Sequence, residues 1–156
     1  MRNTVARLTV LTAACLFLSG VSFGQTSPNK IRPTITPDGN PVRSTPAFAE
    51  VVLRKTEIES ELEALLIDYT DDFPKVSELK YELSLVNGEA ERLLAVKPVE
   101  AGKLTLALGK LIIKKVSLEA ALWELSKTYK DEHPEIKRAK RRVEIYQSAI
   151  KEILGR

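Results

Sequence analysis

The side chains that could bind a metal ion lie in or directly after two short segments, YTDDFP at 69–74 and YKDEHP at 129–134. Carboxylate oxygens are the ligands that calcium prefers, so a weak divalent-cation site would form if folding brought both segments to one end. The same acids have a simpler explanation, because negative charge near a helix N-terminus stabilises the helix by about 0.3–1 kcal/mol. We therefore assign no metal ligands. The residues considered are Asp71, Asp72, Asp131, Glu132, His133 and Glu135.

The densest positive charge follows the second of these segments. The basic residues there are Lys137, Arg138, Lys140, Arg141 and Arg142. Such a patch could bind an anionic polysaccharide or the headgroups of a membrane. It equally fits a solvated helix face, because Ala139 and Val143 take the positions that would face a core. Both interpretations stay open.

The chain offers little for covalent or acid–base catalysis. His133 is the only histidine, Cys15 is the only cysteine, and no glycine-rich loop has phosphate-binding spacing. We therefore predict that the protein is not an enzyme and uses no cofactor.

The two segments belong to an internal repeat with an offset of sixty residues. The recurring residues are Tyr69, Asp71 and Pro74, followed sixty positions later by Tyr129, Asp131 and Pro134. Apolar residues on both sides keep this offset without a gap, in steps of three and four that are typical of paired helices. An internal duplication explains the common register better than chance does.

Each segment predicts the corner of a helical hairpin. Proline lacks a backbone donor and biases the preceding residue toward extended backbone, so both prolines should begin helices. The expected helices lie at about 47–70, 74–96, 103–130 and 134–154. The fold class is thus all-α: hairpin repeat 1 (47–96) and hairpin repeat 2 (103–154) form an antiparallel four-helix bundle or coiled coil. Alternatively, the hairpins splay apart or exchange between chains.

The third expected helix differs from the first in being apolar on two sides. Its second stripe is Leu106, Ile113, Val116, Ala120 and Trp123. Sixty positions earlier this stripe turns polar, with Glu63 at the place of Trp123. The stripe fits a helix at the centre of a bundle. It also fits a contact surface, which makes Ile113, Val116 and Trp123 candidate interface residues.

Residues 1–24 have the composition of a cleavable secretory signal. Arg2 and Arg7 precede an apolar run that ends in small residues, and cleavage is expected after Gly24. We favour cleavage over a lipid anchor at Cys15, because the apolar run continues past this cysteine. The two arginines supply most of the formal net charge of +3, so charge gives no reason to expect nucleic acid as a partner. The predicted location is periplasmic or secreted.

The next segment, 25–46, contains five prolines and almost no apolar periodicity. This composition predicts a flexible or partly polyproline linker, and it equally fits a disordered leader. The expected organisation is therefore a signal peptide (1–24), a linker (25–46) and one helical domain (47–156).

The hairpin corners resemble those of a family of envelope proteins. LWELSKTYKDEHPEI, and more loosely LEALLIDYTDDFPKV, are similar to the periplasmic coiled-coil hairpins of bacterial polysaccharide chain-length determinant and exopolysaccharide export proteins. Such proteins also carry two membrane spans around an α/β region, and some carry a tyrosine kinase, which these residues do not match. The resemblance implies helical hairpins in a bacterial envelope.

These features together predict an exported, non-enzymatic protein that acts as a small envelope scaffold or adaptor. Its partner would be a second copy of the chain or another envelope protein, since exposed apolar stripes usually mark contacts. The alternative is an extracytoplasmic binding module for an anionic glycan, a membrane surface or a divalent cation.

Overall fold

The computed structural model describes residues 39–155, and every regular element in this range is a helix. Hairpin 1 consists of α1 (Pro46–Asp68) and α2 (Pro74–Leu94), and hairpin 2 consists of α3 (Leu106–Thr128) and α4 (Pro134–Leu154). The short 3₁₀ helices η1 (Pro41–Ser44) and η2 (Pro98–Lys103) precede hairpins 1 and 2. The predicted all-α class is confirmed, and each α-helix of hairpin 2 begins and ends sixty residues after its counterpart. Within the described range, no helix has both the length and the apolar character needed to cross a membrane.

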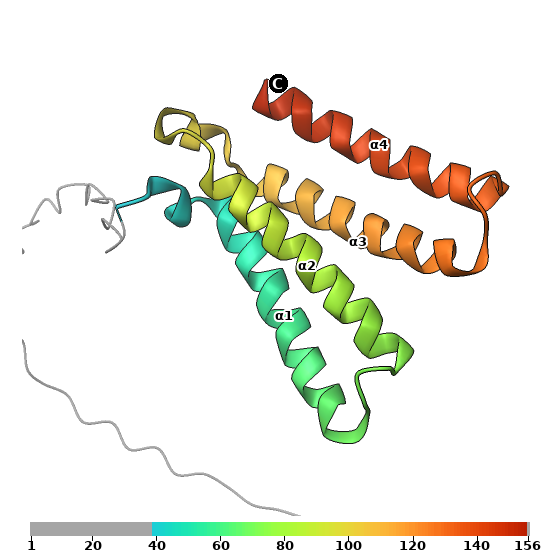
Figure 1. The fold of residues 1–156 in the computed structure, drawn as a ribbon. Helices are drawn as coiled ribbons and strands as arrows, with labels where there is room; N and C mark the ends of the chain where they lie inside the picture. Colours follow the sequence, from blue (N-terminus) through green and yellow to red (C-terminus); the bar gives the residue numbers. More distant parts are fainter. Residues whose placement is uncertain (1–38, 156) are drawn as a thin grey trace, which may run out of the picture. The chain divides into compact units, whose positions relative to one another are not determined.

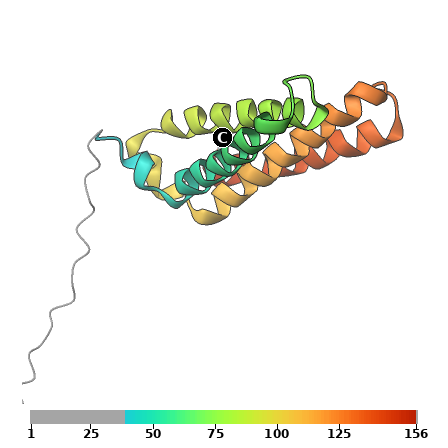
Figure 2. The same ribbon diagram turned by 90° about the horizontal axis from the view of Figure 1, so that it is seen from below.

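α3 lies at the centre of the arrangement, because it packs against each of the other three α-helices. α4 packs mainly against α3, and α1 packs against both α2 and α3. Figure 1 shows the two hairpins diverging, so that their corners lie well apart, and Figure 2 shows the same helices from below. The hairpins therefore splay from a shared region and do not close into a bundle in which α4 also covers α1.

Gly109 sets the distance between the two hairpins. A Cβ atom at this position would lie 2.9 Å from the Cα of Ala47 and 2.9 Å from the Cβ of Glu50, so α3 approaches α1 as closely as only glycine permits. The backbone N–H of Ala47 donates to the carbonyl of Leu104 at 3.2 Å. One contact between the hairpins thus lies near the starts of α1 and α3.

The main core lies where α1, α2 and α3 converge. Its members are Val42, Ala47, Val51, Ile58, Leu79, Val86, Leu93, Val96, Leu104, Leu108, Ile112 and Val116. α4 contributes only Ile150 and Leu154, which are partly buried at the border of this core. The apolar stripe predicted for both hairpins is therefore better buried in hairpin 1 than in hairpin 2.

Threonine side chains explain where α1 and α3 begin. The hydroxyl of Thr45 accepts a hydrogen bond from the N–H of Phe48 at 3.4 Å, and that of Thr105 accepts one from Leu108 at 3.3 Å. Both threonines have extended backbone, as N-cap residues do. The repeat thus extends to the capping residues.

The end of the expected linker is ordered, which corrects its boundary at residue 46. Val42 in η1 is fully buried in the core. The side chain of Asn40 accepts a hydrogen bond from the N–H of Val42 at 3.0 Å, and the Thr45 hydroxyl donates to the Val42 carbonyl at 2.7 Å. One valine among prolines has no periodicity, so the sequence pattern did not predict this turn. The rest of the linker and the expected signal peptide, including Cys15, lie outside the described residues.

Candidate functional site

The two hairpin corners are built in the same way from an aromatic stack. Tyr69 follows α1, and its ring stacks on that of Phe73 with centroids 4.1 Å apart. Tyr129 stacks on His133 at the same distance. Phe73 and His133 have extended backbone and directly precede the first residues of α2 and α4, which confirms the predicted corners. The ring before each proline packs back on the tyrosine and closes the turn.

An ion pair braces each corner. Asp71 lies 2.8 Å from the Nζ of Lys80, and Asp131 lies 3.0 Å from that of Lys140. These side chains are exposed, so each pair contributes only about 0.2–1 kcal/mol. The corner-motif residues thus have structural contacts that account for their recurrence in both repeats.

The corner acids do not gather at one tip. The hairpins diverge, so Asp71 and Asp131 belong to corners that lie apart (Figure 1), and each already pairs with a lysine. His133 accepts a hydrogen bond at Nδ1 from the N–H of Glu135 at 3.2 Å. Among the residues that the structure describes, no three histidine or acidic side chains are placed to hold a metal ion. The expectation that both sets of corner acids meet at one end, on which the cation alternative depended, is therefore wrong.

Trp123 lies between the two hairpins. Its ring stacks on Tyr81 of α2 with centroids 4.4 Å apart, and the Nζ of Lys127 lies 3.6 Å from the ring centre. Trp123 and Ile113 are half-buried, whereas Val116 is fully buried. α3 uses this side to pack against hairpin 1, as expected for a central helix. The alternative prediction, in which these three residues form a contact surface for another chain, is therefore wrong for Val116. This side chain is fully buried, so a partner cannot reach it.

A buried ion pair joins α2 to α3. The Nζ of Lys115 lies 2.5 Å from Oε1 of Glu89, and both side chains are less than a tenth exposed, at 8% and 9%. Arg92 also contacts Glu89, and Glu119 lies 3.5 Å from Lys115. A shift of one helix along the other would break this contact and leave each buried charge with only the partner on its own helix, so the pair favours one register. The sequence pattern did not predict this pair, because charged residues on a helix are usually solvated.

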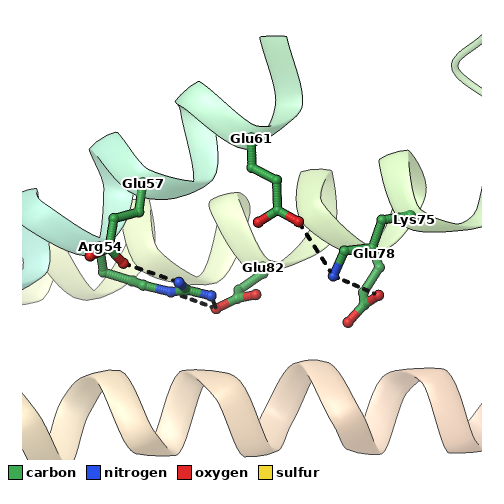
Figure 3. A network of polar contacts seen from close by, with 6 residues as sticks. All are labelled: Arg54, Glu57, Glu61, Lys75, Glu78 and Glu82. Atoms are coloured by element: carbon green, nitrogen blue, oxygen red, sulfur yellow. Dashed lines mark hydrogen bonds and ion pairs between the residues drawn. The ribbon is translucent and has the colours of Figure 1, made fainter. Parts of the chain in front are cut away.

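Further ion pairs connect the helices of hairpin 1 (Figure 3). Nε and Nη2 of Arg54 donate to Oε1 of Glu82 at 3.0 and 2.7 Å, and Nη1 donates to Glu57 at 3.1 Å. Burial of the guanidinium lowers the pKa of Arg54, but the bonds to Glu82 and Glu57 raise it further, and the net pKa lies above its ordinary value. A raised pKa stabilises the fold below the ordinary pKa of arginine and loses its effect only above it. This contribution is therefore constant at physiological pH.

Hairpin 2 has no counterpart of this network. The positions sixty residues after Arg54, Glu57 and Glu82 hold Lys114, Ser117 and Arg142. Lys114 and Arg142 are exposed and make no ion pair within residues 39–155. Two cations thus take the places that a cation and its carboxylate occupy in hairpin 1.

The predicted anionic-surface patch lies on exposed positions of α4. Its members are Lys137, Arg138, Lys140, Arg141 and Arg142. Arg138 pairs with Glu135 and Arg141 pairs with Glu144, both at short range along the helix. Lys137, like Arg142, makes no ion pair in the part of the chain that the structure describes. The patch is therefore only partly neutralised.

Apolar side chains are also exposed beside these cations. Ile145 is 55% exposed and Ile153 is 37% exposed, whereas Leu93, the counterpart of Ile153 in hairpin 1, is 3% exposed. Arg141, Ile145, Ala149 and Ile153 follow one another at intervals of four residues and form one side of α4. We call these four residues the free face of hairpin 2. The sequence pattern alone could not reveal that no helix covers this face.

The surface of α3 between α2 and α4 is hollowed by two open grooves. One has a volume of about 360 Å³ and is lined by Tyr81, Trp123 and Ile136 among others. The second, about 380 Å³, lies beside Leu93 and Ile150. They lie there because α4 packs mainly on α3 and makes few contacts with α2.

Comparisons of the chain with protein-family models, curated proteins and solved structures find no match.

Proposed function

We propose that the protein is an exported, non-enzymatic scaffold or adaptor of a bacterial envelope that acts through helix packing. The contact surface is the free face of hairpin 2, and the partner is a second copy of the chain or another envelope protein. The location follows from the signal-like N-terminus and from the resemblance of the corners to the envelope hairpins of polysaccharide chain-length determinants.

The unequal burial of equivalent residues supports this proposal. Leu93 of hairpin 1 is almost fully buried, and its repeat counterpart Ile153 is 37% exposed. Ile145, one helical turn before Ala149 on the same side, is 55% exposed. Apolar residues that a repeat buries in one copy and exposes in the other are typical of a surface that needs another helix.

Sedimentation equilibrium tests the proposal on protein purified from an expressing bacterium, in whichever processed form it is recovered. We expect association at tens of micromolar and its loss in Ile145→Glu, which places a charge in the apolar contact. Ser148→Glu adds the same charge to another exposed position of α4 and should associate like the wild type. For a different envelope partner, a photo-crosslinking residue at position 145 should capture one protein that the same residue at 148 does not. Monomeric wild type without a position-specific crosslink would contradict the proposal.

A binding module for an anionic glycan or a membrane surface is the second candidate. It is favoured by Lys137 and Arg142, which lie exposed on α4 without an ion-pair partner in the described range. Binding to vesicles that contain anionic lipid, or to a sulfated polysaccharide, should then weaken steeply with added salt. The double variant Lys137→Gln and Arg142→Gln should bind more weakly than Lys110→Gln with Lys151→Gln, which removes the same charge elsewhere. Equal binding by the two double variants would contradict this candidate.

A further inference from the structure

We infer that the free face of hairpin 2 binds α1 of a second copy of the chain, in the position that α3 takes on hairpin 1. Each copy would then offer a different surface to each of two neighbours. This inference rests on the proposed function and names its partner. It follows from the internal repeat, because the chain already contains one example of the contact.

The example within the chain is the packing of α3 on hairpin 1. Three contacts define it: Gly109 lies against α1, Lys115 pairs with Glu89 of α2, and Trp123 stacks on Tyr81 of α2. Moving this contact by one repeat replaces α3 with α1 of a second copy and replaces hairpin 1 with hairpin 2. The residues that would then meet are read directly from the sixty-residue offset.

The offset converts the central stack into an ion pair. The counterpart of Trp123 is Glu63 on α1, and the counterpart of Tyr81 is Arg141 on the free face. Both residues are exposed. Glu63 makes no ion pair within the described residues, and Arg141 pairs only with Glu144 of its own helix. Opposite charges thus stand at the two positions that a stacked aromatic pair occupies inside the chain.

The apolar residues of the two surfaces match in the same way. Ile112 and Ile113 of α3 pack toward hairpin 1, and their counterparts on α1 are Val52 and Leu53. These two side chains are 41% and 55% exposed. They would meet the exposed isoleucines of the free face. Each surface thus supplies apolar area that its own chain leaves uncovered.

The two hairpins carry opposite charge. The helices of hairpin 1 contain ten carboxylates and five cations, whereas those of hairpin 2 contain five carboxylates and ten cations. Such a difference steers hairpin 1 of one copy toward hairpin 2 of another and disfavours contacts between like hairpins. It favours a head-to-tail arrangement over a symmetric dimer of free faces.

The contact between copies would be looser than the one within the chain. Ala49 takes the place of Gly109, so a methyl group keeps α1 from approaching its partner as closely as α3 approaches α1. No counterpart of the Lys115–Glu89 pair forms either, because Ala149 replaces the glutamate. A contact between two different surfaces generates open chains of molecules, or a ring where the rotation between copies closes.

Charge-reversal variants test the inference in sedimentation equilibrium. Glu63→Arg and Arg141→Glu should each weaken self-association about tenfold or more, because like charges then meet at the contact. In an equimolar mixture of the two variants, one contact between unlike chains should be as strong as the contact in the wild type. At that contact, the unaltered Arg141 of the Glu63→Arg chain meets the unaltered Glu63 of the Arg141→Glu chain. Glu91→Arg and Lys151→Glu make the same charge changes at exposed positions off both surfaces, and should associate like the wild type.

The outcomes separate this inference from the proposed function. Wild-type association that persists in both single variants would place the contact elsewhere, which overturns the inference and leaves the scaffold proposal standing. Loss of association in Arg141→Glu alone would indicate a contact between two free faces and would also overturn the inference. A mixture that stays dissociated would do the same. Wild type that is monomeric at tens of micromolar, with no crosslinked partner at position 145, would overturn both.

Discussion

Replacing Gly109 by alanine should force the two hairpins apart where they meet. The new Cβ would lie 2.9 Å from the Cα of Ala47, an atom of the α1 backbone that cannot rotate away. Carbon atoms in contact are normally about 3.5–4.0 Å apart, so the helices must separate by roughly 0.6–1 Å. Such overpacking costs about 1–3 kcal/mol, against a gain of about 0.8–1 kcal/mol from replacing glycine in a helix. We expect the free energy of unfolding to fall by about 0–2 kcal/mol.

Gly88 provides a matched control for this substitution. A Cβ atom at Gly88, in α2, would meet no atom within 4 Å. Gly88→Ala should therefore raise the free energy of unfolding by about 0.8–1 kcal/mol, because only helix propensity changes. The difference between the two variants, about 1–3 kcal/mol, measures the contact between α1 and α3. Urea unfolding followed by circular dichroism gives both values, and equal stability of Gly109→Ala and Gly88→Ala would refute the close approach.

Three further predictions concern the buried ion pair, the tryptophan and export. Lys115→Met should lower the free energy of unfolding by up to about 3–5 kcal/mol, because it leaves the buried Glu89 carboxylate with only its contact to Arg92, and adding Glu89→Leu should recover most of this loss; an equally unstable double variant in urea unfolding would contradict the pairing. Trp123→Glu should cost about 2 kcal/mol, since a half-buried ring and its stack on α2 are lost; an unchanged melting temperature would show that the ring contributes little. N-terminal sequencing should find a chain that begins near Gln25 in the periplasm or the medium, and an unprocessed chain in the cytosol would exclude export by a cleaved signal.

The helices and corners were predictable because their signals are local. A proline after an extended residue begins α2 and α4, and a threonine caps each of the other two helices. These signals act within one turn of helix, so they can be read without knowing how the chain packs. The sixty-residue offset also carried each assignment from one repeat to the other.

The relative placement of the hairpins depends on contacts between distant residues and could not be read in this way. The same apolar stripe in each hairpin suggested a closed bundle, but the close approach at Gly109 joins the hairpins near their helix starts and lets them diverge. Val42 belongs to the core although its neighbours read as a linker. The pair of Lys115 with Glu89 has no pattern of its own, since only the packing of α2 on α3 brings the two together.

The local nature of the corner contacts also bears on the order in which the chain folds. Tyr69 meets a ring four residues later, and Lys140 meets a carboxylate nine residues earlier. Contacts between such near neighbours form fast, so each hairpin should close by itself before the two dock. Changes at the corners should then alter the folding rate, whereas changes at Gly109 should mainly alter the unfolding rate. During docking, a hairpin can also pack on the equivalent hairpin of a neighbouring molecule, because that molecule has the same surface. Refolding at high protein concentration should therefore yield molecules that have exchanged hairpins.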